Sequence, residues 1–264
     1  MEWFYIIIFV SGLIFGSFLN AYFWRVRENK SIWTGRSMCT KCKNKIKWFD
    51  NIPIVSFLIL RAKCRSCRRK ISWQYPLVEL WMGLVFVFIY YHISHITYHI
   101  PIYIPLVVDC FIIWFLTLIF LYDLKYQEIL DRFTLIPAAI LFIGILIFQF
   151  FNLSIFPSVA SMLVGAGIAS GFFLAQFLIS KGRWIGGGDI RLGVLMGVIL
   201  GWKLTILALF LAYIIGAVIG IILLIFSKKK FDSQIAFGTF LTVATFICMF
   251  WGDGILNWYF RLIM

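Results

Sequence analysis

Several long stretches of this 264-residue chain contain no Asp, Glu, Lys or Arg, among them residues 3–24, 133–180 and 204–227. A membrane-spanning helix needs about 20 apolar residues to cross roughly 30 Å of hydrocarbon, so each stretch is long enough for at least one helix. The whole chain is 62% hydrophobic and 13% charged, which is too little charge to cover the surface of a soluble domain. These stretches therefore predict an all-α polytopic membrane protein.

Eight spans are expected, with the sixth too short to cross the bilayer fully. It is therefore expected to be tilted, partial or buried among its neighbours. Three regions follow: a first span at 1–24, a polar loop at 25–75 and a membrane-embedded core at 76–264. The eight spans are 4–24, 76–97, 103–122, 133–151, 158–180, 192–202, 204–227 and 235–259.

Basic residues predict the orientation of these spans. With the N-terminus outside, 22 of the 24 Lys and Arg residues fall in the inside segments 25–75, 123–132, 181–191 and 228–230. Such a bias is typical of cytoplasmic loops, so the polar loop is expected in the cytoplasm. The same bias explains the net charge of +13, and no aromatic-interleaved basic motif points to nucleic acid.

Two Cys-x-x-Cys pairs stand in the polar loop, 21 residues apart. Four thiolates at this spacing can surround one Zn²⁺ tetrahedrally, and the alternatives are disulfides or unligated thiols. A reducing cytoplasm argues against disulfides. The zinc ligands expected are Cys39, Cys42, Cys64 and Cys67.

An apolar stretch from Trp48 to Leu58 separates the two cysteine pairs. We expect it to lie on the bilayer or against the spans. The basic residues around it are expected to meet anionic lipid head groups.

Four acidic residues are expected near membrane depth, where a charge is costly and suggests function: Glu79, Asp109, Asp123 and Asp189. Two of them, Asp123 and Asp189, are expected at the same inner level of the membrane. Paired carboxylates can share a proton and hydrolyse a peptide bond through an activated water. Glycines beside Asp189 would let an extended substrate approach. Two alternatives stay open at this point, namely interfacial charges paired with Lys125 and Arg191, or a cation or proton pathway.

The ordered motifs of this chain resemble the type IV prepilin peptidase family, which consists of bifunctional leader peptidases and N-methyltransferases. The motifs are Gly16–Asn20, both cysteine pairs, Trp48–Pro53, Tyr75–Leu80, Tyr122–Leu124 with Asp131, Gly186–Leu192 and Phe237–Leu241. Thr239 stands where the family usually has proline, and Arg191 stands for lysine.

The resemblance implies a GxGD-type membrane aspartyl protease with Asp123 and Asp189 as its catalytic residues. It implies cleavage of a basic leader just after a glycine, in a prepilin or pseudopilin, at the bacterial inner membrane. Methylation of the new N-terminus by S-adenosylmethionine is implied as a second activity. Glu79, Gly186 and Gly188 are candidate residues for binding the substrate or the methyl donor. The alternative role for Glu79 is structural, as an acidic residue at a helix start that the helix dipole favours.

Three histidines at helical spacing, His92, His95 and His99, invite a metal-site interpretation. They are expected at the outer end of the second span, and an exposed interfacial cluster is the preferred interpretation. The surroundings of Asp109 do not follow from the sequence.

Overall fold

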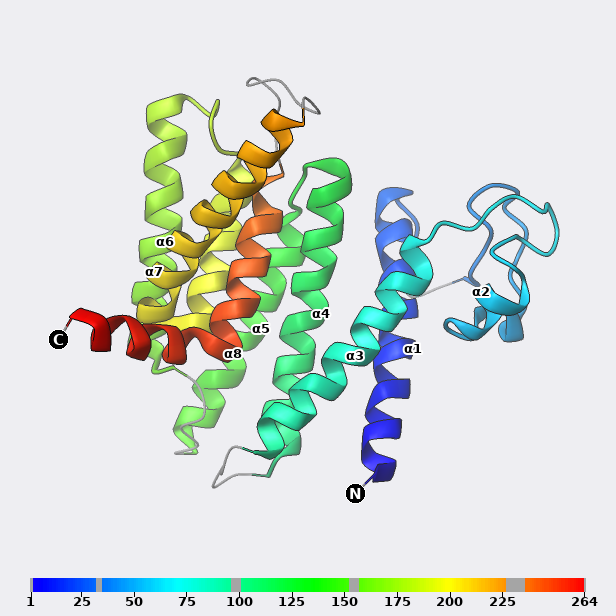
Figure 1. Ribbon diagram of the computed structural model, residues 1–264, viewed down its shortest axis with the longest axis horizontal. Coiled ribbons are helices and arrows are strands. Elements are labelled where there is room, and N and C mark those ends of the chain that lie inside the picture. The colour runs from blue at the N-terminus through cyan, green and yellow to red at the C-terminus, as the bar shows by residue number, and fades with distance from the viewer. Residues whose placement is uncertain (1, 32–34, 96–100, 152–156, 227–235, 264) are drawn as a thin grey trace. The chain divides into compact units, whose positions relative to one another are not determined.

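The computed structural model describes residues 2–31, 35–95, 101–151, 157–226 and 236–263 (Figure 1). His99 and Lys228–Lys230 lie outside the described residues. Every regular element in the described part is a helix. The elements are α1 (Glu2–Arg27), the 3₁₀ turn η1 (Trp48–Asn51), α2 (Val55–Ile59), α3 (Gln74–Ser94), α4 (Tyr103–Tyr126), α5 (Asp131–Phe150), α6 (Val159–Ser180), α7 (Gly187–Ile225) and α8 (Phe237–Ile263).

By length and composition, seven of the described helices can cross a membrane: α1 and α3 to α8. Many of their exposed side chains are large and apolar, as a lipid-facing surface requires. The prediction of an all-α polytopic fold is confirmed. The helix α4 continues past the expected end at residue 122, so that Asp123 lies inside its last turn.

The chain divides into two compact units, one up to Trp114 and one from Phe115 onward, and the division falls within α4. In the first unit, α1 packs closely against α3 (Figure 1). Glycine permits this approach, because a Cβ on Gly16 would lie only 2.7 Å from the Cα of Glu79. The polar loop begins at the end of α1 and returns to α3, so these two helices hold both of its ends.

In the second unit, the long helix α7 breaks at Gly201, whose φ of 68° and ψ of 176° are open only to glycine. The arm before the break runs antiparallel to α6, because Gly193 packs against Ala169 and Gly201 against Gly165. The arm after the break turns back along the same helix.

Hydrogen bonds at two levels of α6 establish this reversal. The Trp202 N–H donates to Ser161 Oγ (3.2 Å), near the start of α6, and Tyr213 Oη donates to Gln176 Oε1 (2.9 Å), near its end. The expected segments 192–202 and 204–227 are therefore the two arms of one helical hairpin, which Figure 1 draws from yellow to orange. Residues 187–200 extend about 21 Å at 1.5 Å per residue, so the first arm is short, as the sequence predicts.

Candidate active site and metal centre

Asp123 is buried in the last turn of α4, with 4% of its surface exposed. Its Oδ2 atom accepts a hydrogen bond from the Thr239 N–H (2.9 Å), and the Gly238 N–H also donates to this carboxylate. Both donors belong to the first turn of α8, where backbone N–H groups have no partner inside the helix and favour a negative charge. A proline at position 239 would have no N–H to donate.

Asp189 lies in the first turn of α7 and is also buried, with 7% exposed. Its Oδ2 atom accepts a hydrogen bond from the N–H of Gly186, the residue that precedes the helix (3.3 Å). Each of the two carboxylates is thus held at the N-terminus of a helix, where the helix dipole offsets part of the cost of burying a negative charge.

One side chain, Ile129 in the loop between α4 and α5, lies against both of these helix starts. A Cβ on Gly188 would be 2.7 Å from Ile129 Cβ, and a Cβ on Gly238 would be 2.6 Å from Ile129 Cδ1. The carboxylates of Asp123 and Asp189 are near enough to repel each other when both are ionised. The structure therefore brings together the two aspartates singled out from the sequence.

This arrangement is suited to general acid–base chemistry. Two neighbouring buried carboxylates favour a state in which only one is ionised, so one accepts a proton while the other donates one. Gly186 leaves room beside Asp189, because a Cβ there would have no atom nearer than 3.9 Å, whereas the space at Gly188 is filled by Ile129.

The ion-pairing alternative for Asp189 is not what the structure shows. Arg191 forms an ion pair with Asp131 at the start of α5, and both side chains are substantially exposed. This pair joins the starts of α5 and α7 without involving either buried carboxylate.

Glu79 belongs to the first unit and has surroundings of a different kind. It lies beyond the first turn of α3 and is 7% exposed, so it is not an acidic residue at a helix start. Its carboxylate accepts hydrogen bonds from the Ile54 N–H (2.8 Å) and from the Ser17 hydroxyl. Ile54 has a φ of 61°, which is a rare conformation for a β-branched residue. Glu79 therefore anchors a strained turn of the polar loop to α1 and α3.

The two cysteine pairs form matching turns. In each turn the N–H of the first cysteine donates to a carbonyl five residues later, Cys39 to Asn44 and Cys64 to Arg69, both at 2.9 Å. Lys43 and Arg68, four residues after those cysteines, both have a left-handed backbone, and each turn is flanked by one isolated β-bridge. This local repeat aims both pairs of thiols at a common point.

The four sulfur atoms fit one metal ion. The thiols of Cys39, Cys42, Cys64 and Cys67 are free and lie within 4.8 Å of one another, and the Sγ atoms of Cys39 and Cys67 are 4.0 Å apart. Tetrahedral Zn²⁺ with Zn–S bonds of about 2.3 Å places sulfur atoms roughly 3.8 Å apart. Within the described residues, these cysteines form the one group of three or more His, Cys, Asp and Glu placed to share a metal.

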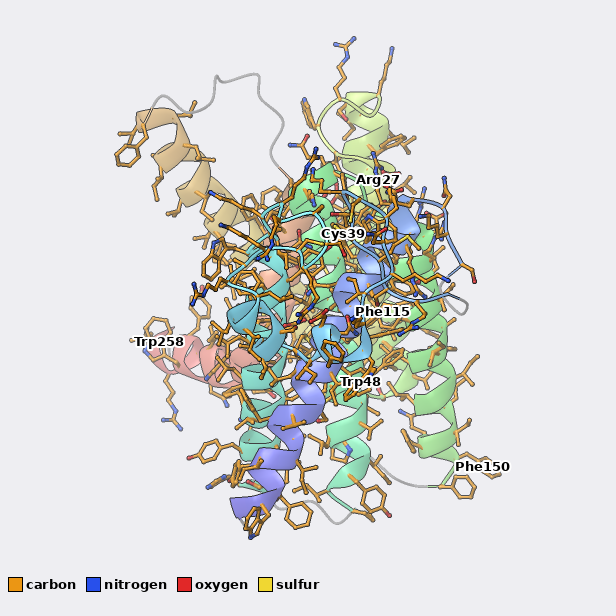
Figure 2. The ribbon with its side chains drawn as sticks, turned by 90° about the vertical axis from the view of Figure 1, so that its right-hand side faces the viewer. Arg27, Cys39, Trp48, Phe115, Phe150 and Trp258 are labelled. Carbon is orange, nitrogen blue, oxygen red and sulfur yellow. The ribbon has the colours of Figure 1, made fainter. Side chains whose placement is uncertain are left out.

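An ion pair braces the segment between the cysteine pairs. Arg65 binds Asp50 with two hydrogen bonds (2.9 and 2.6 Å), and this contact holds the pKa of the Asp50 carboxyl below its ordinary value. Next to Asp50, the Trp48 side chain is 75% exposed. Figure 2 shows Trp48 nearer than Cys39 to the N-terminal end of α1. The loop thus presents an apolar surface along the first unit.

His92 and His95 make local contacts at the C-terminal end of α3. His95 Nδ1 lies 2.8 Å from the carbonyl oxygen of Tyr91, and the His92 ring stacks on Phe88. Asp109 is half-buried in α4.

Comparisons with known proteins cover nearly the whole chain. Residues 10–93 match the bacterial peptidase A24 N-terminal domain, and residues 110–221 match the type IV leader peptidase family. The chain is 31% identical to a prepilin leader peptidase/N-methyltransferase of Legionella pneumophila over 97% of this chain and 95% of the relative. Identity to the protein of the same name from Aeromonas salmonicida is 28%, over 100% and 97% of the two chains. No solved structure matches.

Proposed function

Because the chain belongs to the prepilin leader peptidase/N-methyltransferase family, we propose that it cleaves the leader of a type IV prepilin or pseudopilin with Asp123 and Asp189. The observation that carries this proposal is the pair of buried carboxylates held at two helix starts around Ile129. If Asp123 and Asp189 served only to form structural ion pairs, basic side chains would be expected against their carboxylates.

In the proposed reaction, the ionised carboxylate takes a proton from water while the water oxygen bonds to the scissile carbonyl carbon. The protonated carboxylate donates a hydrogen bond to the carbonyl oxygen, where negative charge develops. The carbon–nitrogen bond then breaks, and a proton goes to the leaving amine. Because the pair titrates as a unit, neither role is assigned to one residue.

The proposed cleavage point is the cytoplasmic face of the bacterial inner membrane, with the N-terminus outside and the cysteine loop inside. The distribution of Lys and Arg supports this orientation. A prepilin with a basic leader would place its junction after glycine at the level of the two aspartates. The junction must be extended there, since a helical backbone has no free carbonyl for attack. Gly186 would leave room for that segment, whereas Gly188 packs against Ile129.

Methylation of the new N-terminus is the second proposed activity. S-adenosylmethionine would supply the methyl group when bound, and the names of the relatives support this step. Glu79 is a candidate for positioning the donor site, because it anchors the polar loop.

Zn²⁺ at the four cysteines would serve a structural purpose, fixing a loop that is too short to build a core. Anionic lipids would meet the basic residues of this loop.

The test is cleavage of a purified prepilin by the purified protein in detergent, with and without S-adenosylmethionine. Cleavage after the leader glycine is expected in both conditions, and mass spectrometry should find the mature N-terminus methylated only with the donor. A protein that binds prepilin without cleaving it would refute the peptidase proposal. That outcome would favour the alternatives, a cation site in a transporter or channel or a zinc-bearing scaffold.

A second substrate tests the depth of the site. The glycine junction is moved one helical turn, about 5.4 Å, into the apolar segment of the prepilin. Cleavage should fall sharply, because the peptide bond then lies away from Asp123 and Asp189. An unchanged rate would contradict the proposed position of the site.

A further inference from the structure

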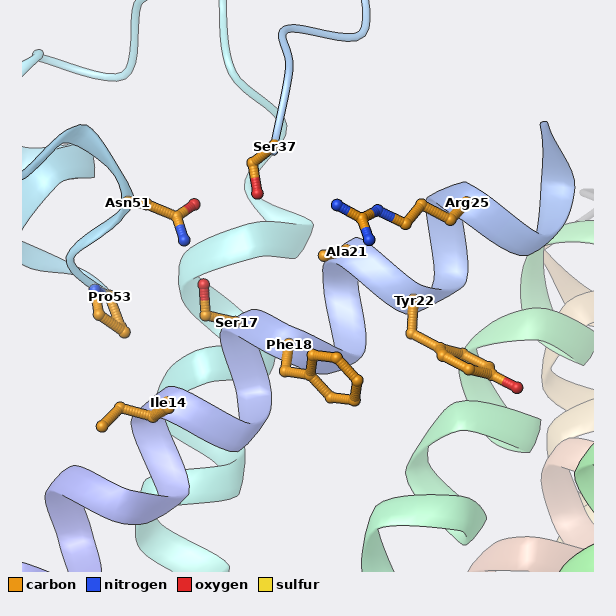
Figure 3. Close-up of a pocket in the computed structure, with 9 residues that line it drawn as sticks. All are labelled: Ile14, Ser17, Phe18, Ala21, Tyr22, Arg25, Ser37, Asn51 and Pro53. Carbon is orange, nitrogen blue, oxygen red and sulfur yellow. The ribbon is translucent and has the colours of Figure 1, made fainter. Parts of the chain in front are cut away.

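A cavity of about 240 Å³ opens in the first unit between α1 and the polar loop. It is distinct from the carboxylate pair, which belongs to the second unit. Residues from successive turns of α1 form one wall, and loop residues form the other (Figure 3). The cavity is lined by Ile14, Ser17, Phe18, Ala21, Tyr22, Arg25, Ser37, Asn51 and Pro53.

Four polar side chains converge on this space above Ala21. Figure 3 shows Ser17 and Arg25 pointing into it from α1, and Ser37 and Asn51 pointing into it from the loop. Arg25 is oriented by a hydrogen bond from its Nη2 atom to the carbonyl oxygen of Gly35 (2.7 Å). The cavity therefore offers a guanidinium, an amide and two hydroxyls to one small polar group.

A negative charge stands behind one end of the cavity. The Ser17 hydroxyl donates to the buried carboxylate of Glu79, which also accepts the Ile54 N–H next to Pro53. Arg25 stands two turns after Ser17 along α1, and its guanidinium reaches back over Ala21 to the end of the cavity away from Ser17 (Figure 3). A ligand in the cavity thus meets positive charge at one end and negative charge at the other.

We propose that this cavity binds the amino-acid end of S-adenosylmethionine, an assignment that rests on the proposed methyltransferase function. An α-carboxylate matches Arg25, because guanidinium binds carboxylate in a planar, two-pronged geometry. An α-ammonium matches the Asn51 carbonyl oxygen and the Ser17 hydroxyl, with Glu79 behind them. Complete ligand sites measure about 300–1,000 Å³, so a cavity of this size holds one end of the donor rather than the whole of it.

The loop wall of the cavity depends on the cysteine turns and on Glu79. Ser37 stands two residues before Cys39, and Asn51 follows Asp50, which is braced to Arg65 beside Cys64. A loop without its metal would lose the fixed positions of Ser37 and Asn51. Zinc removal is therefore expected to weaken donor binding, although no cysteine touches the cavity.

The test measures binding of two nucleosides to the full-length protein in detergent, by equilibrium dialysis. S-adenosylhomocysteine has the amino-acid end, and 5′-methylthioadenosine lacks it. Arg25→Gln should weaken S-adenosylhomocysteine binding about ten- to a hundredfold and leave 5′-methylthioadenosine binding unchanged. The matched control is Arg27→Gln, which removes a charge from the same helix turn outside the cavity lining and should change neither affinity.

A second pair of variants addresses shape. Ala21→Leu fills the cavity and should abolish S-adenosylhomocysteine binding, whereas Ala160→Leu makes the same change on an exposed face of α6 and should not. Equal losses of both ligands in Arg25→Gln, or unchanged binding in Ala21→Leu, would overturn the proposal. So would native mass spectrometry in which Ala21→Leu loses bound phosphatidylglycerol but keeps the nucleoside, since the cavity would then hold a lipid phosphate.

Failure of the proposed peptidase function gives a different result. A wild-type protein that binds S-adenosylhomocysteine in the predicted way, but leaves the prepilin uncut, would refute the aspartate mechanism and support the cavity assignment. A protein that cuts the prepilin but does not bind S-adenosylhomocysteine would support the aspartate mechanism and refute the cavity assignment.

Discussion

Adding one methyl group at Gly188 should disable the aspartate pair without removing either carboxylate. The Cβ of an alanine there would lie 2.7 Å from Ile129 Cβ, whereas ordinary contacts begin near 3.4 Å. The neighbouring atom is the branched Cβ of Ile129 rather than a flexible chain end, so α7 and the Ile129 loop must separate by about 0.7 Å. Asp189 is the next residue and would move with the helix start.

A misplacement of about 1 Å in a catalytic group costs on the order of a hundredfold in rate, so we expect kcat/KM to fall about ten- to a hundredfold. Gly187→Ala is the matched control. Its Cβ would lie 3.7 Å from Arg191 Nη2, an ordinary contact, and both substitutions carry the same gain in helix propensity of about 0.5–1 kcal/mol. The assay is cleavage of purified prepilin by each variant, at equal amounts of folded protein by circular dichroism.

Two results would refute this reasoning. If Gly188→Ala cleaves as fast as wild type, the close approach to Ile129 does not position Asp189. If Gly187→Ala is equally impaired, the first turn of α7 needs glycine for another reason, such as backbone flexibility. A smaller residue at 129 gives a further check, because Ile129→Gly should recover part of the activity of Gly188→Ala.

Three further predictions address the aspartates, the loop anchor and the metal. Asp123→Asn and Asp189→Asn should each abolish prepilin cleavage in the purified assay with membrane insertion intact, while Asp131→Asn should be milder because its ion pair is exposed. Glu79→Gln keeps the acceptor for the Ile54 N–H but loses its charge, so limited proteolysis should cut the loop faster while the helices stay intact; an unchanged loop would contradict the anchoring role. Metal analysis should find about one zinc per chain in the wild-type protein, and replacing the four loop cysteines with serine should remove it and make residues 25–75 the first site of proteolysis.

Much of the fold follows from the sequence because membrane helices must satisfy their own backbone hydrogen bonds and present apolar side chains to lipid. Uncharged stretches therefore place most helices within a few residues, and the end of α4 is one of the exceptions. Asp123 and Lys125 mark an interface by composition, yet the helix continues through them to Tyr126. Charge alone does not end a helix whose backbone hydrogen bonds are still being made.

The contacts around the candidate site do not follow from the sequence in the same way. The sequence indicates Asp123 and Asp189 by type and depth, but not that amides of Thr239 and Gly186 hold them. Those bonds depend on where α8 begins relative to α4, which is a long-range packing outcome. The same limit applies to Ile129, an unremarkable aliphatic residue by sequence that lies against two helix starts in the structure.

The reversal of α7 at Gly201 has a consequence for how the protein is made. The arm that carries Asp189 is too short to span the bilayer, so a translocon is expected to insert it together with the arm that follows, as one hairpin. A topology reporter that replaces the chain after Lys203 would leave the first arm without its partner. The side of the membrane that it reports would then be that of a truncated chain. Reporters inserted within the full-length protein avoid this artefact, because both arms of the hairpin are then synthesised and inserted before the location of the reporter is measured.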